Sequence, residues 1–184
     1  MIDRQKAEKA ASDLLTALGE DVNNPSIVDT PARVARMFEE LLCGRNQDAA
    51  DLLSQVFPLE NPGLVIERDI PFYSLCEHHL LPFMGKVHIA YLPRKEVTGL
   101  SKLARTVDVY ARRLQLQERM TNQICLAIHE NLHTEGVLVV AEAEHFCMSM
   151  RGVKKPGATT ITVAACGVFE DPAEREHVLS LLKL

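Results

Sequence analysis

The sequence contains no tryptophan and no apolar stretch as long as a membrane span. A helix that crosses the hydrocarbon core of a bilayer needs about 18–20 mostly apolar residues, so this chain is not expected to cross a membrane. The first six residues, Met1–Lys6, lack the apolar core and the small-residue cleavage site of a secretory signal. We therefore expect a protein of the cytoplasm.

An excess of positive charge is also missing. The 20 Lys and Arg residues are outnumbered by 25 Asp and Glu residues, which gives a formal net charge of −5. Nucleic-acid-binding proteins usually present a net basic surface, so general nucleic-acid binding is not expected; a local basic pocket for one anionic ligand is compatible with this charge.

The five cysteines are odd in number and irregular in spacing, which argues against a disulfide framework. A reducing compartment fits them best, and there a Cys/His cluster more often binds metal or acts in catalysis.

The length of 184 residues suits one domain with a real core, or a domain plus an appended helical segment. Hydrophobic periodicity and chain-breaking residues predict helices over residues 3–18, 29–44, 48–55, 101–114, 118–132 and from 171 onward, and strands over residues 64–70, 86–92, 137–150 and 159–169. Asp29 and Ser101 are predicted to cap the helices that they begin. This order predicts an α+β fold with an antiparallel sheet. Pro58 and Asn61-Pro62-Gly63 indicate a linker, which predicts an N-terminal helical segment, residues 1–63, and a second unit, residues 64–184. Pro71, Pro82 and Gly85 indicate irregular backbone between the first two predicted strands.

The stretch Cys76-Glu77-His78-His79 places a thiol and two imidazoles between apolar neighbours. Cys76 and His79 form a C-x-x-H pair, and zinc accepts both sulfur and imidazole nitrogen. No second C-x-x-C or H-x-x-H pair follows, so a third ligand has to come from far along the chain. The best candidate is Cys147, with His145 as a competitor or as a neighbour of the ligand. Two cysteines and one histidine would leave a fourth position for water, as in a catalytic zinc site.

An ordinary role for these residues is an open alternative. Cys76 and Cys147 can be small buried apolar residues, and the histidines can form local hydrogen bonds. For the other three cysteines, Cys43, Cys125 and Cys166, this ordinary role is the prediction, because they lie within helical or strand patterns.

His78 and His145 are the candidate proton carriers, because imidazole titrates nearest to neutral pH. If residues 137–150 are extended, successive side chains alternate between faces, and His145 and Cys147 project from the same face. A ligand would then lie beside a proton carrier.

Cations gather at two places in the sequence. Ser101, Lys102 and Arg105 lie near the start of a predicted helix, where a phosphate is favoured by free N–H groups and the helix dipole. Arg151 directly follows the predicted Cys147 strand and adds to this basic character. The alternative for each is a solvated basic face, and this is also the ordinary interpretation of Arg33.

Gln117-Glu118 lies between two predicted helices. A carboxylate at Glu118 can accept two hydrogen bonds from the edge of a guanine ring. The sequence alone indicates only a glutamate that stabilises a helix start.

Together, these pieces resemble the GTP cyclohydrolase I family. Five blocks in consistent order, from about Thr30 to Gly167, carry the resemblance. The blocks are Asp29-Thr30-Pro31-Ala32-Arg33-Val34-Ala35, Cys76-Glu77-His78-His79, Gly99-Leu100-Ser101-Lys102-Leu103-Ala104-Arg105, Arg113-Leu114-Gln115-Leu116-Gln117-Glu118-Arg119, and His145-Phe146-Cys147-Met148-Ser149-Met150-Arg151-Gly152-Val153.

The resemblance implies a zinc-dependent enzyme of the first step of folate and pterin biosynthesis. It would hydrolyse GTP at C8, open the ring, release formate and rearrange the ribose to give 7,8-dihydroneopterin triphosphate. The implied zinc ligands are Cys76, His79 and Cys147. The other implied roles are proton transfer by His78 and His145, assistance at the ribose by Ser101, recognition of the guanine edge by Glu118 with Gln117, and a triphosphate grip by Lys102, Arg105 and Arg151, with Arg33 reaching in from a neighbouring subunit.

The fold implied by the resemblance is the tunnelling fold, an antiparallel sheet with two helices packed on it, here with additional N-terminal helices. Subunits of this fold assemble into a barrel, usually as two stacked pentamers with active sites between subunits. A homo-oligomer, most simply a decamer, is therefore expected.

Two alternatives stay open at this point. The first is another enzyme of the same fold, such as a pterin aldolase, a pterin synthase or a deazaguanine reductase; the combination of Cys76, His79 and Cys147 with a triphosphate-binding arc is not their pattern. The second is a zinc-stabilised nucleotide-binding or interaction module without catalysis, which predicts a closed site of four ligands and no turnover.

Overall fold

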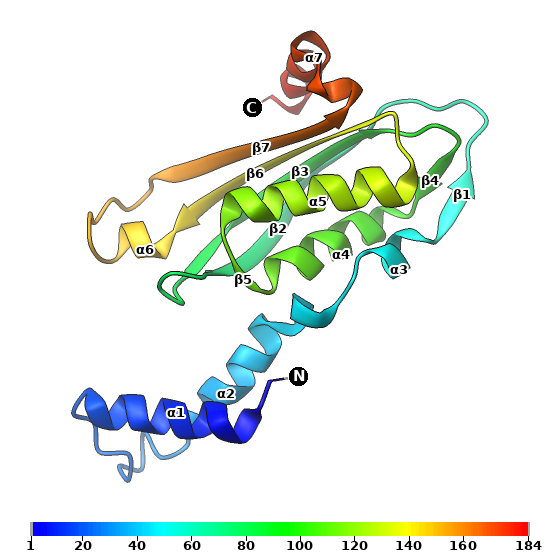
Figure 1. The fold of residues 1–184 in the computed structure, drawn as a ribbon. Helices are drawn as coiled ribbons and strands as arrows, with labels where there is room; N and C mark the ends of the chain where they lie inside the picture. The colour runs from blue at the N-terminus through cyan, green and yellow to red at the C-terminus, as the bar shows by residue number, and fades with distance from the viewer. Residues whose placement is uncertain (1, 184) are drawn as a thin grey trace.

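A five-stranded sheet with two helices on one face forms the body of the protein in the computed structural model, which describes residues 2–183 (Figure 1). The strand order in the sheet is β5-β2-β3-β6-β7. The helices are α1 (Arg4–Ala17), α2 (Thr30–Leu41), α3 (Ala50–Leu53), α4 (Leu100–Ala111), α5 (Gln117–Leu132), α6 (Phe146–Ser149) and α7 (Pro172–Leu182), with 3₁₀ turns η1 (Cys43–Asn46) and η2 (Val168–Glu170). The strands are β1 (Val56–Pro58), β2 (Val65–Cys76), β3 (Pro82–Leu92), β4 (Glu96–Thr98), β5 (Leu114–Gln115), β6 (Gly136–His145) and β7 (Thr159–Gly167).

Four of these strands, β2, β3, β6 and β7, pair antiparallel, and the short β5 pairs in parallel with the end of β2. Side chains alternate between the two faces of a strand. On β6, Val137 and Val139 therefore face α4 and α5, while Leu138 and Val140 face the smaller core under α7 and η2. The α+β class and the sheet covered by two helices, as expected of a tunnelling-fold subunit, are confirmed.

The apolar sides of α4 and α5 were largely visible in the sequence. Leu103 and Val107 of α4 are fully buried against the sheet, as are Ile124 and Ile128 of α5. Leu114 is an exception, because the helix ends at Ala111 and Leu114 belongs to β5, where it is exposed.

The N-terminal helices form a hairpin that projects from the body (Figure 1). Arg113 attaches the segment after this hairpin to α4. Its guanidinium donates hydrogen bonds to the carbonyls of Gly44, Val109 and Gln47. Gly44 lies so close to α4 that an added Cβ would be 2.4 Å from the Val109 carbonyl oxygen, so only glycine allows this approach.

Several predicted boundaries were wrong. The strands predicted to end at Ile70 and to begin at Lys86 extend to Cys76 and from Pro82. Pro71, taken as a sign of irregular backbone, lies within β2, which has no strand of residues 2–183 on its other side at that position. The predicted linker at Pro58 instead ends β1, which pairs with β4 and so joins part of the first 63 residues to the body.

Of the two residues predicted to cap helices, Asp29 occupies the N-cap position and Ser101 does not. Gly99 occupies the N-cap position of α4, so Ser101 lies within the first turn. Asp29 makes no capping hydrogen bond and instead pairs with Arg33 at 3.1 Å. None of the helices in residues 2–183 combines the length and the apolarity needed to cross a bilayer.

His88 is a buried histidine in the centre of β3. Its Nδ1 accepts a hydrogen bond from the Asp69 N–H at 3.3 Å, while its Nε2 is buried without a hydrogen-bond partner among residues 2–183. Burial lowers the pKa of His88. The charges of Asp69 and Glu142 oppose this shift, and those of Arg68 and Lys86 add to it. The neutral ring is therefore the form that fits the fold.

We expect His88 to make the fold sensitive to acid. Its folded-state pKa lies below the unfolded value of about 6.5, so the unfolded chain binds the proton more readily and the free energy of unfolding falls as the pH drops through that range. His88→Gln, which keeps an acceptor but cannot titrate, should flatten the pH dependence by up to about 1.4 kcal/mol per pH unit. Urea unfolding between about pH 5 and 7 measures this. The exposed His177→Gln is the control, and an unchanged slope in His88→Gln would contradict the burial argument.

Candidate active site

The turn between β2 and β3 holds the Cys-Glu-His-His stretch at one end of the sheet. The Cys76 N–H donates to the Leu81 carbonyl at 2.8 Å, and the Cys76 carbonyl accepts from the Leu80 N–H at 2.9 Å. Leu80 has a φ of 55°, a left-handed conformation that lets the chain reverse within a few residues. As a result Cys76 is buried under the turn, while His78 and His79 are exposed on it.

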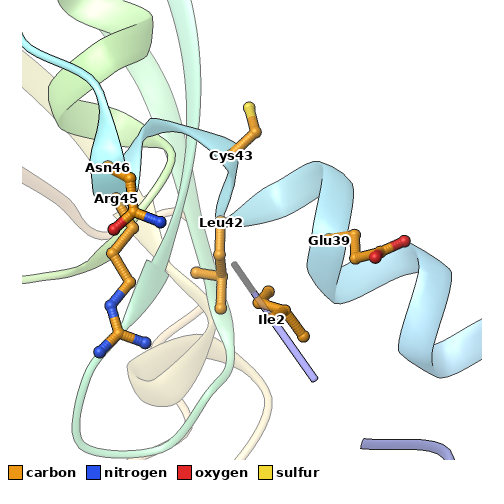
Figure 2. Close-up of a pocket in the computed structure, with 6 residues that line it drawn as sticks. All are labelled: Ile2, Glu39, Leu42, Cys43, Arg45 and Asn46. Atoms are coloured by element: carbon orange, nitrogen blue, oxygen red, sulfur yellow. The ribbon is translucent and has the colours of Figure 1, made fainter. Parts of the chain in front are cut away.

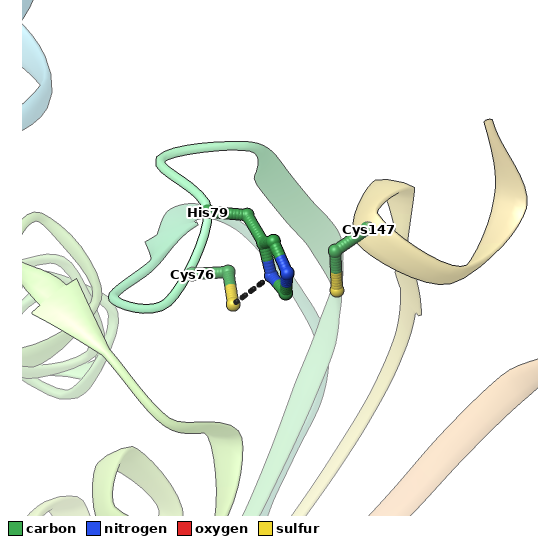
Figure 3. A group of neighbouring side chains, drawn as sticks. All are labelled: Cys76, His79 and Cys147. Atoms are coloured by element: carbon green, nitrogen blue, oxygen red, sulfur yellow. Dashed lines mark hydrogen bonds between the residues drawn. The ribbon is translucent and has the colours of Figure 1, made fainter. Parts of the chain in front are cut away.

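Cys147 meets this turn from the helical turn α6 (Figure 3). The prediction that residues 137–150 form one extended strand is wrong at its end, because β6 stops at His145. The chain then turns, and the ligand atoms of Cys76, His79 and Cys147 lie within 4.8 Å of one another. The Cys76 Sγ is 3.9 Å from the His79 Nδ1.

The donor set of this cluster fits zinc. Two thiols and one imidazole are typical zinc ligands, and three protein ligands leave a coordination position for a small molecule. Burial, together with the neighbouring Cys76 thiol, raises the pKa of Cys147. Because the thiolate is the form that binds metal, loading of the cluster would release protons.

His145, at the end of β6, is held by contacts on two sides. Its ring stacks on Phe83 with centroids 4.7 Å apart, and its Nε2 lies 2.7 Å from the Gln117 Oε1. The amide nitrogen of Gln117 donates to the carbonyls of Ala141 and Thr160, both at 2.9 Å. These two acceptors fix the orientation of the amide, so Oε1 faces His145 and the imidazole donates from Nε2. In the neutral ring, Nδ1 is then the nitrogen that can accept a proton.

Gln117 and Glu118 are adjacent in sequence but differ sharply in their exposure to solvent. Gln117 is buried, and its side chain is fully engaged with the sheet and His145. Glu118 is exposed at the start of α5. Burial lowers the pKa of His145, and the negative charge of Glu118 opposes this shift.

Arg151 reaches the cluster from the loop after α6. Its Nη1 is 2.9 Å from the His79 Nε2. Glu144 restrains this loop through two hydrogen bonds, which its carboxylate accepts from the Ser149 hydroxyl and from the Gly157 N–H. These two bonds, the Ser149 bond foremost, lower the pKa of Glu144.

Four other predicted site residues lie away from the cluster within one chain. The end of α4 is near Cys76, since β5 follows that helix and pairs with Leu75–Cys76. Ser101 and Lys102 are at the other end of α4, about 15 Å from Ala111 along the helix axis at 1.5 Å per residue, with Arg105 one turn further in. Arg33 is on α2, in the projecting hairpin.

The cavities at the junction with the N-terminal hairpin are also separate from the cluster. One of about 400 Å³ is lined by Ile2, Glu39, Leu42, Cys43, Arg45 and Asn46 (Figure 2). Another, of about 230 Å³, lies between η1 and α4 and includes Arg105 and Arg112. Neither contains Cys76, His79 or Cys147.

An ion pair beside the site involves two residues to which sequence reasoning gave no role. Arg119 donates two hydrogen bonds to the Glu77 carboxylate, each 2.8 Å long, across 42 residues of sequence. The opposite charges of the two residues were the available signal. Such a signal is weak, because the sequence does not indicate which charged residues meet.

Comparison with known proteins extends over almost the whole chain. The family model for GTP cyclohydrolase I matches residues 7–183. The GTP cyclohydrolase 1 of Finegoldia magna is 57% identical over 176 residues, which are 96% of each chain. The GTP cyclohydrolase 1 of Carboxydothermus hydrogenoformans is 54% identical over 184 residues, covering 99% of this chain and 96% of that one.

Among solved structures, an archaeosine synthase QueF-Like in the apo form aligns with 59% of this chain and 97% of its own at 21% identity and a TM-score of 0.48. The sequence matches are much stronger than this structural likeness. Because the family model and both relatives cover nearly the full length, the chain belongs to the GTP cyclohydrolase I family.

Proposed function

We propose that the protein hydrolyses GTP at C8 of the guanine ring, opens the ring, releases formate and forms 7,8-dihydroneopterin triphosphate. The observation that carries the proposal is the cluster of Cys76, His79 and Cys147, whose ligand atoms lie within 4.8 Å of one another beside an oriented His145, in a chain of this family. This would be the first step of folate and pterin biosynthesis.

Cys76, His79 and Cys147 would hold a zinc ion. When bound, zinc supplies a Lewis acid that brings the pKa of a water molecule towards neutrality, so that an otherwise unreactive aromatic carbon can be attacked. The three-ligand set supports this assignment over a purely structural zinc site, which normally closes with four protein ligands.

His145 would accept and return protons at Nδ1. The hydrogen bond from Nε2 to Gln117 keeps the proton of the neutral ring on Nε2, and stacking on Phe83 keeps the ring in one plane. Gln117, predicted to bind substrate, would act through His145, because its side-chain amide is engaged within the chain.

Glu118 and His78 would complete the contacts to the base. Glu118 is exposed at the start of α5, where its carboxylate can accept hydrogen bonds from the ring N–H and the exocyclic amine of guanine. His78 is exposed on the same turn as His79, with ring centroids 6.2 Å apart, and would serve as a second proton carrier.

The triphosphate would be bound at an interface between subunits. Arg151 lies at the metal cluster, whereas Ser101, Lys102 and Arg105 lie along the far part of α4 and Arg33 lies on α2. We expect these four to complete the site of a neighbouring chain, where Ser101 would assist the ribose rearrangement. A homo-oligomer, most simply two stacked pentamers, would bring them together.

Open sheet edges support such an assembly. Within residues 2–183, β7 pairs with β6 alone, and β2 is paired by β5 only at Leu75 and Cys76. β7 also exposes Ile161 and Val163, which are 58% and 48% exposed. An edge strand of nine residues is a ready template for a strand of another chain. Repeated head-to-tail pairing of two different edges gives a ring when the rotation between neighbouring subunits closes.

We further propose that residues 64–184 form the catalytic unit and residues 1–63 a helical segment that contributes Arg33 to a neighbour. The cytoplasm is the proposed location. All five cysteines are free thiols, and a reducing compartment keeps the ligands Cys76 and Cys147 available for metal.

GTP turnover tests the reaction directly. Zinc-loaded protein incubated with GTP is expected to release formate and, after oxidation, a fluorescent pterin. His145→Ala should lower kcat by about 10²- to 10⁴-fold, the usual contribution of a positioned acid–base group, while metal content and GTP affinity stay near wild type. His129→Ala, remote on α5, is the control. If zinc-loaded wild type gives neither product, the hydrolase assignment fails.

Removal of one thiol tests the metal site. Cys147→Ser is expected to weaken zinc binding by more than about 100-fold, since loss of an outer partner alone typically costs 10- to 100-fold. Metal content after dialysis, activity and the thermal unfolding midpoint should be measured together. Metal and activity should fall while the unfolding midpoint of the metal-free protein is kept. The exposed Cys43→Ser should retain both; full activity in Cys147→Ser would refute the ligand assignment.

Subunit mixing tests the shared site. Cys147→Ser and Lys102→Ala should each be inactive, yet co-assembled oligomers should regain activity, because random mixing leaves about a quarter of the interfaces with both residues intact. Cys147→Ser mixed with His145→Ala is the control that should not recover, since these residues belong to the same cluster. If Lys102→Ala does not complement Cys147→Ser, the shared-site arrangement is wrong.

A further inference from the structure

Glu77 lies between the proposed ligand Cys76 and the proposed proton carrier His78, and its carboxylate pairs with Arg119 on α5. Its two carboxylate oxygens accept one hydrogen bond each from the two terminal nitrogens of Arg119, both at 2.8 Å. A planar guanidinium that meets a carboxylate with two parallel bonds restricts orientation as well as distance. These bonds lower the pKa of Glu77, so the carboxylate is charged near neutral pH.

The backbone of Glu77 is fixed at the same point. Its N–H donates to the Gln115 carbonyl at 3.1 Å, directly after the short parallel pairing of Cys76 with Gln115. The turn of residues 77–81 therefore has a backbone anchor to β5 and a side-chain anchor to α5. Both anchors lie on the segment that leads from β5 into the start of α5.

The first turn of α5 thus contacts a residue close in sequence to a ligand on each side of the cluster. Gln117 binds the Nε2 of His145, which precedes Cys147 by two residues. Arg119 binds Glu77, which follows Cys76. Glu118, the proposed guanine ligand, lies between them and is exposed.

We propose that Glu77 and Arg119 are positioning residues. Their ion pair sets the place of the Cys76–His79 turn relative to the first turn of α5, and so sets the distance between the metal ligands and the carboxylate that holds the base. The kinetic part of this inference rests on the proposed GTP hydrolysis; the metal-binding part stands without it.

The competing explanation is that the Glu77–Arg119 pair only stabilises the fold. The solvent exposure of the two side chains argues against this explanation. The side chains are 29% and 42% exposed, and ion pairs with this exposure contribute little to stability. The proposal and the competing explanation therefore predict different measurements. Loss of a positioning contact changes metal affinity and kcat, whereas loss of a stabilising contact changes only the unfolding midpoint.

The test uses the full-length oligomer with Arg119→Gln and Glu77→Gln. Cobalt(II), whose thiolate absorption bands report ligation by Cys76 and Cys147, is titrated into metal-free protein without GTP. Each variant is expected to bind cobalt about 10- to 100-fold more weakly than wild type, the usual cost of losing a partner outside the ligand shell. With zinc and GTP, kcat is expected to fall about 10-fold or more, with a smaller change in KM. Arg119→Lys, which keeps the charge but loses the paired bonds, should fall in between.

Arg94→Gln is the matched control, because it breaks an ion pair of similar length, 2.9 Å to Glu135, beyond the other end of β3. It should leave cobalt affinity and kcat unchanged.

The double variant Glu77→Gln with Arg119→Gln should lose no more cobalt affinity and kcat than either single variant, since one contact is removed in all three. Wild-type cobalt affinity in both single variants, or additive losses in the double variant, would overturn the proposal. A wild type that binds cobalt but leaves GTP intact would refute the proposed function and leave the metal-binding test valid.

Discussion

The register of β3 against its two neighbours is the constraint on which the candidate site depends. Phe83 lies opposite Ser74 of β2 on one side and opposite His145 of β6 on the other. Cys76 follows Ser74 by two residues and Cys147 follows His145 by two, so this register brings both thiols to the same end of the sheet. A slip of one residue would turn every side chain of a strand to the opposite face. The buried alternation along β3, packed against α4 and α5, is what prevents that slip.

The elements that sequence reasoning located well are those with a long one-sided apolar pattern. α5 is such a case, because Ile124, Ile128 and Leu132 follow its helical period and are buried. Strand lengths were underestimated because Pro71 and Gly85 were taken as breaks. Pro71 is tolerated where β2 lacks a second neighbour, and Gly85 is required where an added Cβ would be 1.8 Å from the Glu142 carbonyl oxygen. Both reasons depend on which strands are adjacent, and a local pattern does not contain that information.

The candidate site also has parts that a local sequence pattern predicts and parts that depend on distant residues. Cys76 and His79 are close in sequence, and their spacing was enough to predict that the two side chains could share a metal. The approach of Cys147 was expected, but the assumption that Cys147 and His145 lie on one extended strand was wrong, because β6 gives way to a helical turn. The partners that orient these groups could not be found from the sequence: Gln117 contacts His145 across 28 residues, and Arg119 contacts Glu77 across 42. Ligand types are recognisable because metal chemistry restricts them, whereas many polar residue types can serve as their supports.

The outer edge of β7, which has no partner strand within residues 2–183, has a consequence for the chain before the proposed assembly forms. A newly folded monomer presents an uncovered strand with Ile161 and Val163 exposed beside it. Such a surface binds indiscriminately to other unpaired strands and favours aggregation. If subunits assemble as proposed, rapid synthesis has two opposing effects: a high concentration speeds the proposed edge pairing and also speeds non-specific pairing. Solubility during overproduction would then depend on the rate of assembly more than on the stability of the individual subunit.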